Sequence, residues 1–211
     1  LRQCRIDLLT STMKKQAGFT LMELMIVLVI IGILSAAFVA FGGNSLEKGK
    51  VKAAKANLHA ISAMIESYRS VEGEYPSDYL PSGIAVNTTN SRAEALYLAL
   101  FDAEYTGQRP SQDWLINTDS DESVRNTTAL GTRELFEIGD EWDNPIIYFD
   151  SLHYNDRIAT IVMAGEAVIE EQEVNPHRNE RTNSFSKPSS FQLVSAGPDG
   201  LYGTNDDIFS F

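Results

Sequence analysis

Residues 18–41 decide the fold of this chain, and they read GFTLMELMIVLVIIGILSAAFVAF. Residues 24–41 contain no charged side chain. At a rise of 1.5 Å per residue, an α-helix of this length reaches about 27 Å, close to the roughly 30 Å hydrocarbon core of a bilayer. The segment is therefore long and apolar enough to cross a membrane.

One acidic residue, Glu23, stands directly before this apolar run. A carboxylate inside a bilayer costs about 2.5–3.5 kcal/mol by insertion scales, so it indicates a function and requires a partner. The alternative interpretation is an ordinary secretory signal peptide, with Leu24 to Leu34 as its apolar region and cleavage after Ala37. That alternative gives Glu23 no role, and we therefore favour a specialised leader.

The residues around Gly18 resemble the class III leader of type IV pilins and type II secretion pseudopilins. Lys14 and Lys15 form a short basic prefix behind Met13. In this family a membrane aspartyl peptidase cleaves after the glycine and methylates the new amino terminus. The resemblance implies cleavage between Gly18 and Phe19, and it implies that Glu23 faces the amino terminus of a neighbouring subunit during filament assembly.

Composition limits the classes of protein that remain. Removing the eighteen-residue leader from 211 residues leaves 193, enough for one anchor helix and one domain. The single cysteine, Cys4, lies in the leader, so disulfides and thiolate metal sites are excluded from the mature chain. From Leu58 onward the net charge is −17, which argues against binding to a nucleic-acid backbone and suits a divalent cation.

An amphipathic pattern follows the membrane segment. Apolar residues recur at alternating spacings of three and four, which predicts a helix with one face on a domain. They are Val51, Ala54, Leu58, Ile61, Ile65 and Tyr68. Because glycine costs only about 1 kcal/mol in a helix, we expect one helix from Phe19 to Val71. A break at Gly42 and Gly43, separating an anchor from a short core helix, is the alternative.

The remaining sequence predicts an α+β fold: a long N-terminal helix packed on a small antiparallel sheet, as in pilins. Ser91 with Glu94 three residues later predicts a second helix that opens with a capping box. Residues 105–131 are expected to be irregular and 170–190 to be a long exposed loop. Strands are expected at 145–149, 158–164 and 191–196. The predicted segments are the leader 1–18, the transmembrane and assembly helix 19–43, its amphipathic continuation 44–75 and an extracytoplasmic domain 76–211.

Residues 195–208, SAGPDGLYGTNDDI, concentrate three aspartates and three glycines. Calcium takes six to eight oxygen ligands on a chain that turns tightly, and glycine permits such turns. A pair of Asp-Gly and Asn-Asp turns without an ion is the alternative. Adjacent like charges at Asp206 and Asp207, in a strongly acidic domain, favour a cation.

This segment also looks like the calcium loop of the major, G-type pseudopilins of type II secretion. Two further segments are similar to that family, 72–76 (EGEYP) and 142–145 (WDNP), although the position of Asp143 is usually glycine there. Residues 80–140 and 151–190 are not covered by the resemblance. It implies calcium ligands from the side chains of Asp199, Asp206 and Asp207, with backbone oxygens near Ser195 and Leu201.

Signals for catalysis are weak. His59, His153 and His177 stand in three unrelated settings, and none has a neighbour at metal-ligand spacing. Nucleophile elbows, phosphate-binding loops and dinucleotide fingerprints are absent from the sequence. Trp114 and Trp142 are expected to be packing residues. These observations predict a protein that is not an enzyme.

We therefore interpret the chain as a subunit of a type II secretion pseudopilus, which polymerises through its N-terminal helix to help drive protein export. The resemblance implies a homopolymer, a prepilin peptidase, an inner-membrane assembly platform and minor pseudopilins as partners. It also implies a single-pass anchor in the bacterial inner membrane with the domain in the periplasm. The alternatives are a type IV pilus subunit for adhesion, motility or DNA uptake, and a monomeric membrane-anchored binding module or enzyme.

Processing gives the first test. If the leader is cleaved as the motif predicts, mass spectrometry of the membrane fraction should find an N-terminal peptide that begins at methylated Phe19. A mature terminus after Ala37 would instead establish an ordinary secretory signal and remove the basis of the filament interpretation.

Overall fold

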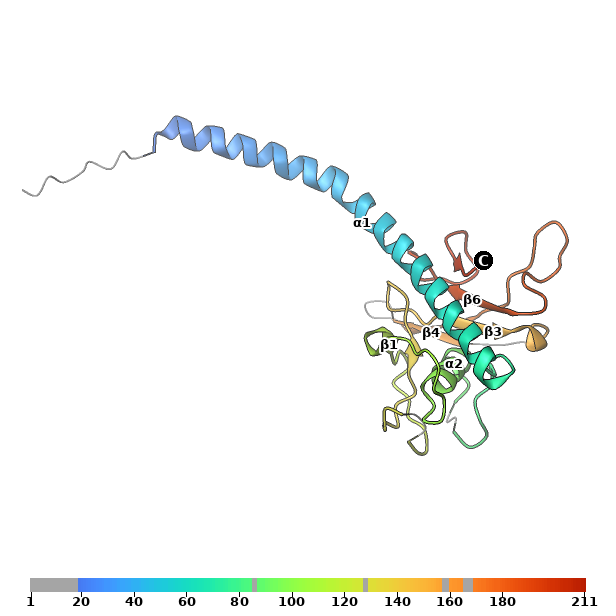
Figure 1. Cartoon of the computed structure of the whole chain (residues 1–211). Coiled ribbons are helices and arrows are strands. Elements are labelled where there is room, and N and C mark those ends of the chain that lie inside the picture. The colour runs from blue at the N-terminus through green and yellow to red at the C-terminus, as the bar shows by residue number, and fades with distance from the viewer. Residues whose placement is uncertain (1–18, 85–86, 127–128, 157–159, 165–168) are drawn as a thin grey trace, which may run out of the picture. The chain divides into compact units, whose positions relative to one another are not determined.

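A computed structural model describes residues 19–84, 87–126, 129–156, 160–164 and 169–211 (Figure 1). The predicted leader, residues 1–18, lies outside the described residues. Contacts divide the chain into two compact units, Leu1–Ser45 and Leu46–Phe211. The first helix, α1, runs from Leu21 to Glu72 and continues through Gly42 and Gly43. The predicted single helix is therefore confirmed.

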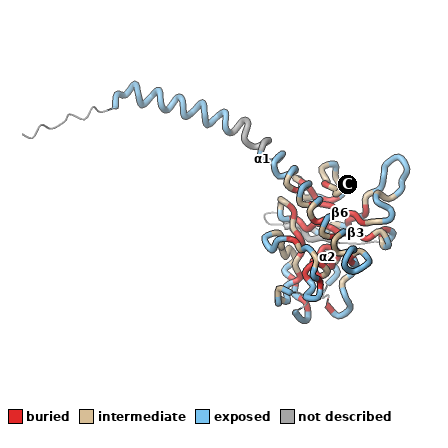
Figure 2. Tube along the Cα trace, in the orientation of Figure 1, coloured by how far each residue is buried: buried red, intermediate tan, exposed pale blue. Residues whose placement is uncertain are grey.

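In the first unit, the side chains from Leu21 to Phe38 are all exposed. In the second unit the same helix has a buried stripe, which is visible in the tube coloured by burial (Figure 2). Ala54, Leu58, Ile61 and Ile65 are at most 2% exposed, as the spacing predicts. The helix ends at Gly73, whose φ of 89° is left-handed and whose N–H donates to the Arg69 carbonyl at 2.9 Å.

The central sheet is antiparallel, in the order β3-β6-β7. Its strands are β3 (Ile147–Asp150), β6 (Phe191–Ser195) and β7 (Ile208–Phe209). Tyr148 pairs with Leu193, and both side chains belong to the main core together with the α1 stripe. Their chain neighbours Ile147 and Val194 point to the opposite face and form a second, smaller core. Both faces of β3 and β6 are thus buried.

Two small sheets lie outside this centre. One pairs β1 (Leu115–Ile116) with β2 (Glu137–Ile138), and the other pairs β4 (Thr160–Ala164) with β5 (Ile169–Glu173). The prediction that 105–131 is irregular is wrong at a short 3-10 helix, Gln112–Trp114, and at β1. The prediction of a loop over 170–190 is wrong where β5 pairs with β4. Residues 179–184 are exposed as predicted.

Helix α2 (Ser91–Phe101) confirms the predicted second helix but not its capping box. The N-cap is Asn90, in a left-handed conformation with φ of 55° and without a side-chain cap hydrogen bond. Asn90 Nδ2 donates instead to Glu137 Oε1 at 2.7 Å. Glu94 is only 1% exposed, so it is buried in the domain instead of capping the first turn of the helix with Ser91. The other described elements include a 3-10 helix at Ser151–His153. The α+β class is confirmed.

Candidate functional site

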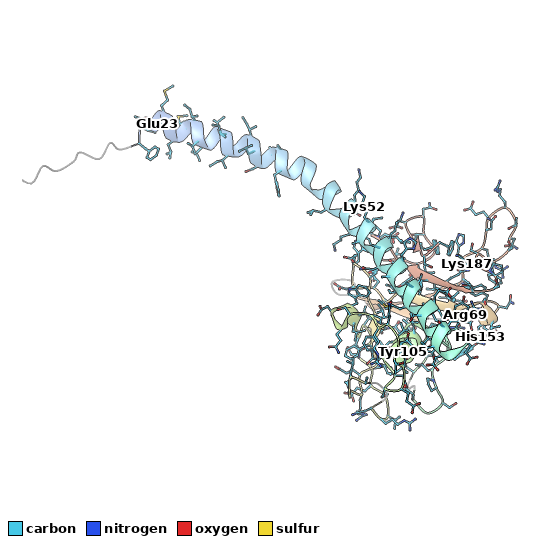
Figure 3. All side chains as sticks on the ribbon, in the orientation of Figure 1. Glu23, Lys52, Arg69, Tyr105, His153 and Lys187 are labelled. Atoms are coloured by element: carbon cyan, nitrogen blue, oxygen red, sulfur yellow. The ribbon has the colours of Figure 1, made fainter. Side chains whose placement is uncertain are left out.

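The first turn of α1 is closed by two side chains that cap each other. The Thr20 N–H and the Thr20 hydroxyl both donate to Glu23 Oε2, at 2.8 and 2.9 Å. The Glu23 N–H donates to Thr20 Oγ1 at 3.2 Å. This reciprocal pattern is a capping box, and the Thr-x-x-Glu spacing in the sequence could have predicted it. Glu23, at the N-terminal end of α1 (Figure 3), thus has a partner within its own subunit.

The helix beyond Glu23 presents apolar side chains that nothing in the described chain covers. Leu21–Phe38 is long and apolar enough to cross a membrane, and none of these residues is buried. Phe19 and Phe38 are 87% and 77% exposed. Such a surface requires lipid or other protein around it.

The C-terminal loop connects β6 to β7, and its aspartates hold its turns. Asp206 Oδ2 accepts from the Asp199 N–H at 2.9 Å, and Asp207 Oδ2 accepts from the Gly203 N–H at 2.8 Å. Gly197 is required here, because its φ is 69° and an added Cβ would lie 2.2 Å from the Asp206 carbonyl oxygen. The loop is therefore built around backbone turns that a side chain at 197 would disrupt.

The donor chemistry of this loop fits calcium. Asp207 Oδ1 is buried and accepts no hydrogen bond, and burial raises the pKa of Asp207. The Leu201 carbonyl and the carboxylates of Asp199 and Asp206 are further oxygen donors. However, the groups of three ligand residues within 4.8 Å among the described residues lie elsewhere, at Asp78, Asp150, His153 and at Glu94, Asp119, Glu137. Calcium binding by the loop thus stays a prediction.

The three segments that carry the resemblance meet around β3. The Tyr148 hydroxyl donates to the Pro76 carbonyl at 2.8 Å. The Tyr202 hydroxyl donates to the carbonyl of Pro145. The Ser195 hydroxyl donates to Asp140 Oδ2 at 2.6 Å, so the turn before β3 contacts the start of the C-terminal loop. Segments far apart in the sequence therefore support one another.

Asp78 and Arg92 form a buried ion pair, and each is 1% exposed. His153 Nδ1 lies 2.6 Å from Asp78 Oδ1, and the Asp150 N–H donates to Asp78 Oδ2 at 3.0 Å. His153 has no neighbour at metal-ligand spacing in the sequence, and the structure instead places it beside Asp78, which is 75 residues away. Burial lowers the pKa of Arg92 to about 10, which leaves it charged at neutral pH. Arg92 therefore supplies the positive charge that this acidic group needs.

The two tryptophans are packing residues, as expected. Trp114 and Trp142 are partly buried against the main core. His59 is exposed, and His177 Nδ1 lies 2.8 Å from Ser186 Oγ.

Comparison with known proteins agrees with the geometry of α1. The family model for the prokaryotic N-terminal methylation motif matches residues 13–39. The chain is 41% identical over 64 residues to the type II secretion system core protein G of Pseudomonas aeruginosa, covering 30% of this chain and 45% of that protein. It is 26% identical over 195 residues to the protein of the same name in Escherichia coli K12, covering 92% and 90%.

The methylation motif and these relatives support a G-type pseudopilin. The matched stretch spans 45% of the length of the Pseudomonas aeruginosa relative. Solved structures gave no match.

The backbone explains how this chain accommodates aspartate at position 143, where glycine is usual in the family that it resembles. Its φ is 62°, a left-handed conformation that glycine adopts without strain. Aspartate tolerates this region better than most residues. The Asp143 N–H donates to the Asp140 carbonyl at 3.2 Å, so the same turn forms with either residue. The departure therefore preserves the local fold.

The Asp78–Arg92 pair gives a stability test for this protein. Asp78→Asn leaves the Arg92 charge buried and unpaired, and should lower the free energy of unfolding by about 3–5 kcal/mol. Glu122→Gln is the control, because Glu122 and Arg133 are 58% and 53% exposed at 3.5 Å and contribute at most about 1 kcal/mol. Urea unfolding of both variants measures the difference. Equal stabilities would contradict the assignment of a buried ion pair.

Proposed function

We propose that this pseudopilin is the structural subunit of a type II secretion pseudopilus and polymerises through the N-terminal half of α1. The observation that carries the proposal is the combination at one helix end of a methylation motif, Glu23 and an uncovered apolar surface. A monomeric enzyme would have no use for this combination. Two histidines also give little support for catalysis, because their Nδ1 atoms already contact other side chains. His153 Nδ1 contacts Asp78, and His177 Nδ1 contacts Ser186.

The apolar surface explains why assembly is favourable. While the subunit is in the bilayer, lipid covers Leu21–Phe38 as well as protein would, so helix packing alone gives little hydrophobic gain. Once a subunit leaves the membrane, the same side chains need the helices of other copies. Each large aliphatic side chain then avoids a cost of about 1.5–3 kcal/mol in water. Polymerisation and extraction are therefore coupled.

Glu23 would select the position of each neighbour. Cleavage at Gly18 creates a positive amino group on Phe19, directly before the Thr20 cap. Among the residues that the structure describes, Glu23 accepts hydrogen bonds only from Thr20, and no cationic side chain pairs with its charge. A second copy can supply that positive charge, and a desolvated carboxylate–amine pair tolerates little misplacement. Glu23 would thus fix the axial register between subunits.

The remaining partners follow from this role. The prepilin peptidase would process Gly18–Phe19, an assembly platform in the bacterial inner membrane would deliver subunits, and minor pseudopilins would join the same filament. The unit Leu46–Phe211 would lie in the periplasm. Calcium would bind the C-terminal loop through the side chains of Asp199, Asp206 and Asp207, with backbone oxygens near Ser195 and Leu201. The orphan oxygen of Asp207 supports this assignment.

Replacing Glu23 tests the assembly proposal. Glu23→Val should leave insertion and cleavage intact, because it removes a membrane penalty, and should strongly reduce filament yield. Glu47→Gln, at an exposed position of the same helix, should assemble like the parent. Electron microscopy of sheared filaments, with immunoblots for processed subunit, measures both. Parental yield from Glu23→Val would refute the pairing with a neighbour.

Calcium gives a separate test of the loop. Binding to the folded state alone adds about 2.7 kcal/mol at a hundredfold excess over Kd, or about 5–10 °C in Tm for a chain of this size. Asp206→Ala should remove this contribution, whereas Glu180→Gln, an exposed control, should keep it. Thermal melts use sodium at matched ionic strength, because any salt screens an acidic domain. An unchanged calcium shift in Asp206→Ala would show that the loop is an ion-free turn.

A further inference from the structure

A second acidic cluster lies between α2 and the β1–β2 sheet, within the segment that the family resemblance does not cover. It joins Glu94 of α2, Asp119 of the loop after β1 and Glu137 of β2, whose ligand oxygens all lie within 4.8 Å of one another. Glu94 and Glu137 are 1% and 0% exposed. Asp121 borders the cluster and is 9% exposed. Four acids thus share a largely buried space.

Available donors satisfy only part of this cluster. Glu137 accepts from Asn90 Nδ2 at 2.7 Å and from the Thr118 N–H at 3.2 Å. Asn87 Nδ2 donates to Asp119 Oδ2 and Asp121 Oδ2 at 3.3 and 3.2 Å. The buried oxygens that accept no hydrogen bond are Glu94 Oε1, Asp119 Oδ1, Asp121 Oδ1 and Asn117 Oδ1. Every orphan atom here is an acceptor, so the missing partner must be positive or must donate hydrogen bonds.

The same helix shows how a buried charge is normally balanced in this protein. Arg92, two residues before Glu94, pairs with Asp78. The ion pairs among the described residues are Arg92–Asp78 and Arg133–Glu122, His153 Nδ1 lies beside Asp78, and none of these contacts involves the cluster. An uncompensated buried carboxylate is costly, and neighbouring carboxylates add repulsion. In agreement, burial, with repulsion from neighbouring acids, raises the pKa of Glu94 to about 10 and of Glu137 to about 8.

We propose that Glu94, Asp119 and Glu137, with Asp121 and Asn117 beside them, bind a divalent cation, calcium. The ligands are all oxygens, which disfavours zinc and other metals that prefer nitrogen or sulfur. Three to four carboxylates and an amide oxygen from separate segments give the flexible, oxygen-rich coordination of calcium. Magnesium instead demands near-ideal octahedral geometry and retains its water. This site is distinct from the C-terminal loop and independent of the proposed function.

Bound calcium would act as a clamp. Glu94 belongs to the first turn of α2, whereas Asp119 and Glu137 flank the excursion between β1 and β2. The segment between β1 and β2 does not pack against the main core along its whole length, since Glu122 and Val124 are exposed. A cation joining both ends of this segment to α2 would order it.

Counting bound ions tests the proposal without assuming the C-terminal site. The probe is calcium chloride, titrated calorimetrically into the detergent-solubilised full chain at fixed ionic strength. We expect two ions per parent chain, one for Asp206→Asn, one for Glu94→Gln and none for the double variant. Glu104→Gln, which removes the same charge from an exposed position, should bind like the parent.

The outcomes separate the two calcium sites. If the parent and Asp206→Asn bind equally but Glu94→Gln loses one ion, the cluster site stands and the C-terminal site fails. If Glu94→Gln binds as many ions as the parent, the cluster proposal is overturned. In case Glu94→Gln unfolds, Asp119→Asn, at a less buried ligand, should show the same loss of one ion.

Thermal melts in the Asp206→Asn background provide a second measurement. Without calcium, Glu94→Gln should melt close to its background, because an amide replaces a carboxyl group that burial keeps protonated when the ion is absent. With saturating calcium the background should melt above Glu94→Gln, since only the background gains from the ion. Protonated glutamate filling a merely structural role would give equal calcium responses in both chains, and that result would also overturn the proposal.

Discussion

Helix α1 imposes the constraint on which the rest of the structure depends, because one hydrogen-bonded backbone carries two different surfaces. From Leu21 to Phe38 the helix is apolar on every side and uncovered. From Val51 to Tyr68 only one stripe is apolar, and that stripe forms part of the main core. A helix that is apolar all round suits lipid or a bundle, whereas a striped helix suits the edge of a domain. The sequence between them therefore has to stay helical, and it does so despite Gly42 and Gly43.

The second unit is acidic, and its structure handles that charge in two ways. Asp78 is buried with Arg92, and the pair is acceptable because both charges are matched. Glu94, on the same helix, is equally buried but has no cationic side chain as partner in the part of the chain that the structure describes. Exposed acids such as Glu104 need no compensation because water solvates them. The difference between Asp78 and Glu94 is thus a difference in counter-charge, and this difference separates an internal ion pair from a cation site.

Sequence reasoning succeeded where a pattern is local and long. The alternating spacing of Leu58, Ile61 and Ile65 predicted the buried stripe, and the run before Phe38 predicted the span. It failed where tertiary contacts decide. Two-residue strands such as β1 and β7 have no measurable periodicity, and β5 reads IEEQE, a polar sequence that does not look like a strand. Glu94 matched the spacing of a capping box, yet Asn90 is the N-cap, and its side-chain amide donates a hydrogen bond to Glu137. Asp78 and His153 are too far apart in sequence to be paired by spacing.

The candidate sites divide in the same way. Glu23 was found because its oddity is local: an acid beside an apolar run. The C-terminal loop was found by composition, although its aspartates hold backbone turns at Asp199, Gly203 and Leu201. The Glu94 cluster could not be found from sequence, because its acids come from α2, a loop and β2, and each alone looks like a solvated surface residue. Only their shared burial reveals a charge imbalance. Since a protein of marginal stability cannot retain several unpaired buried carboxylates at low cost, the imbalance itself points to a bound cation or proton.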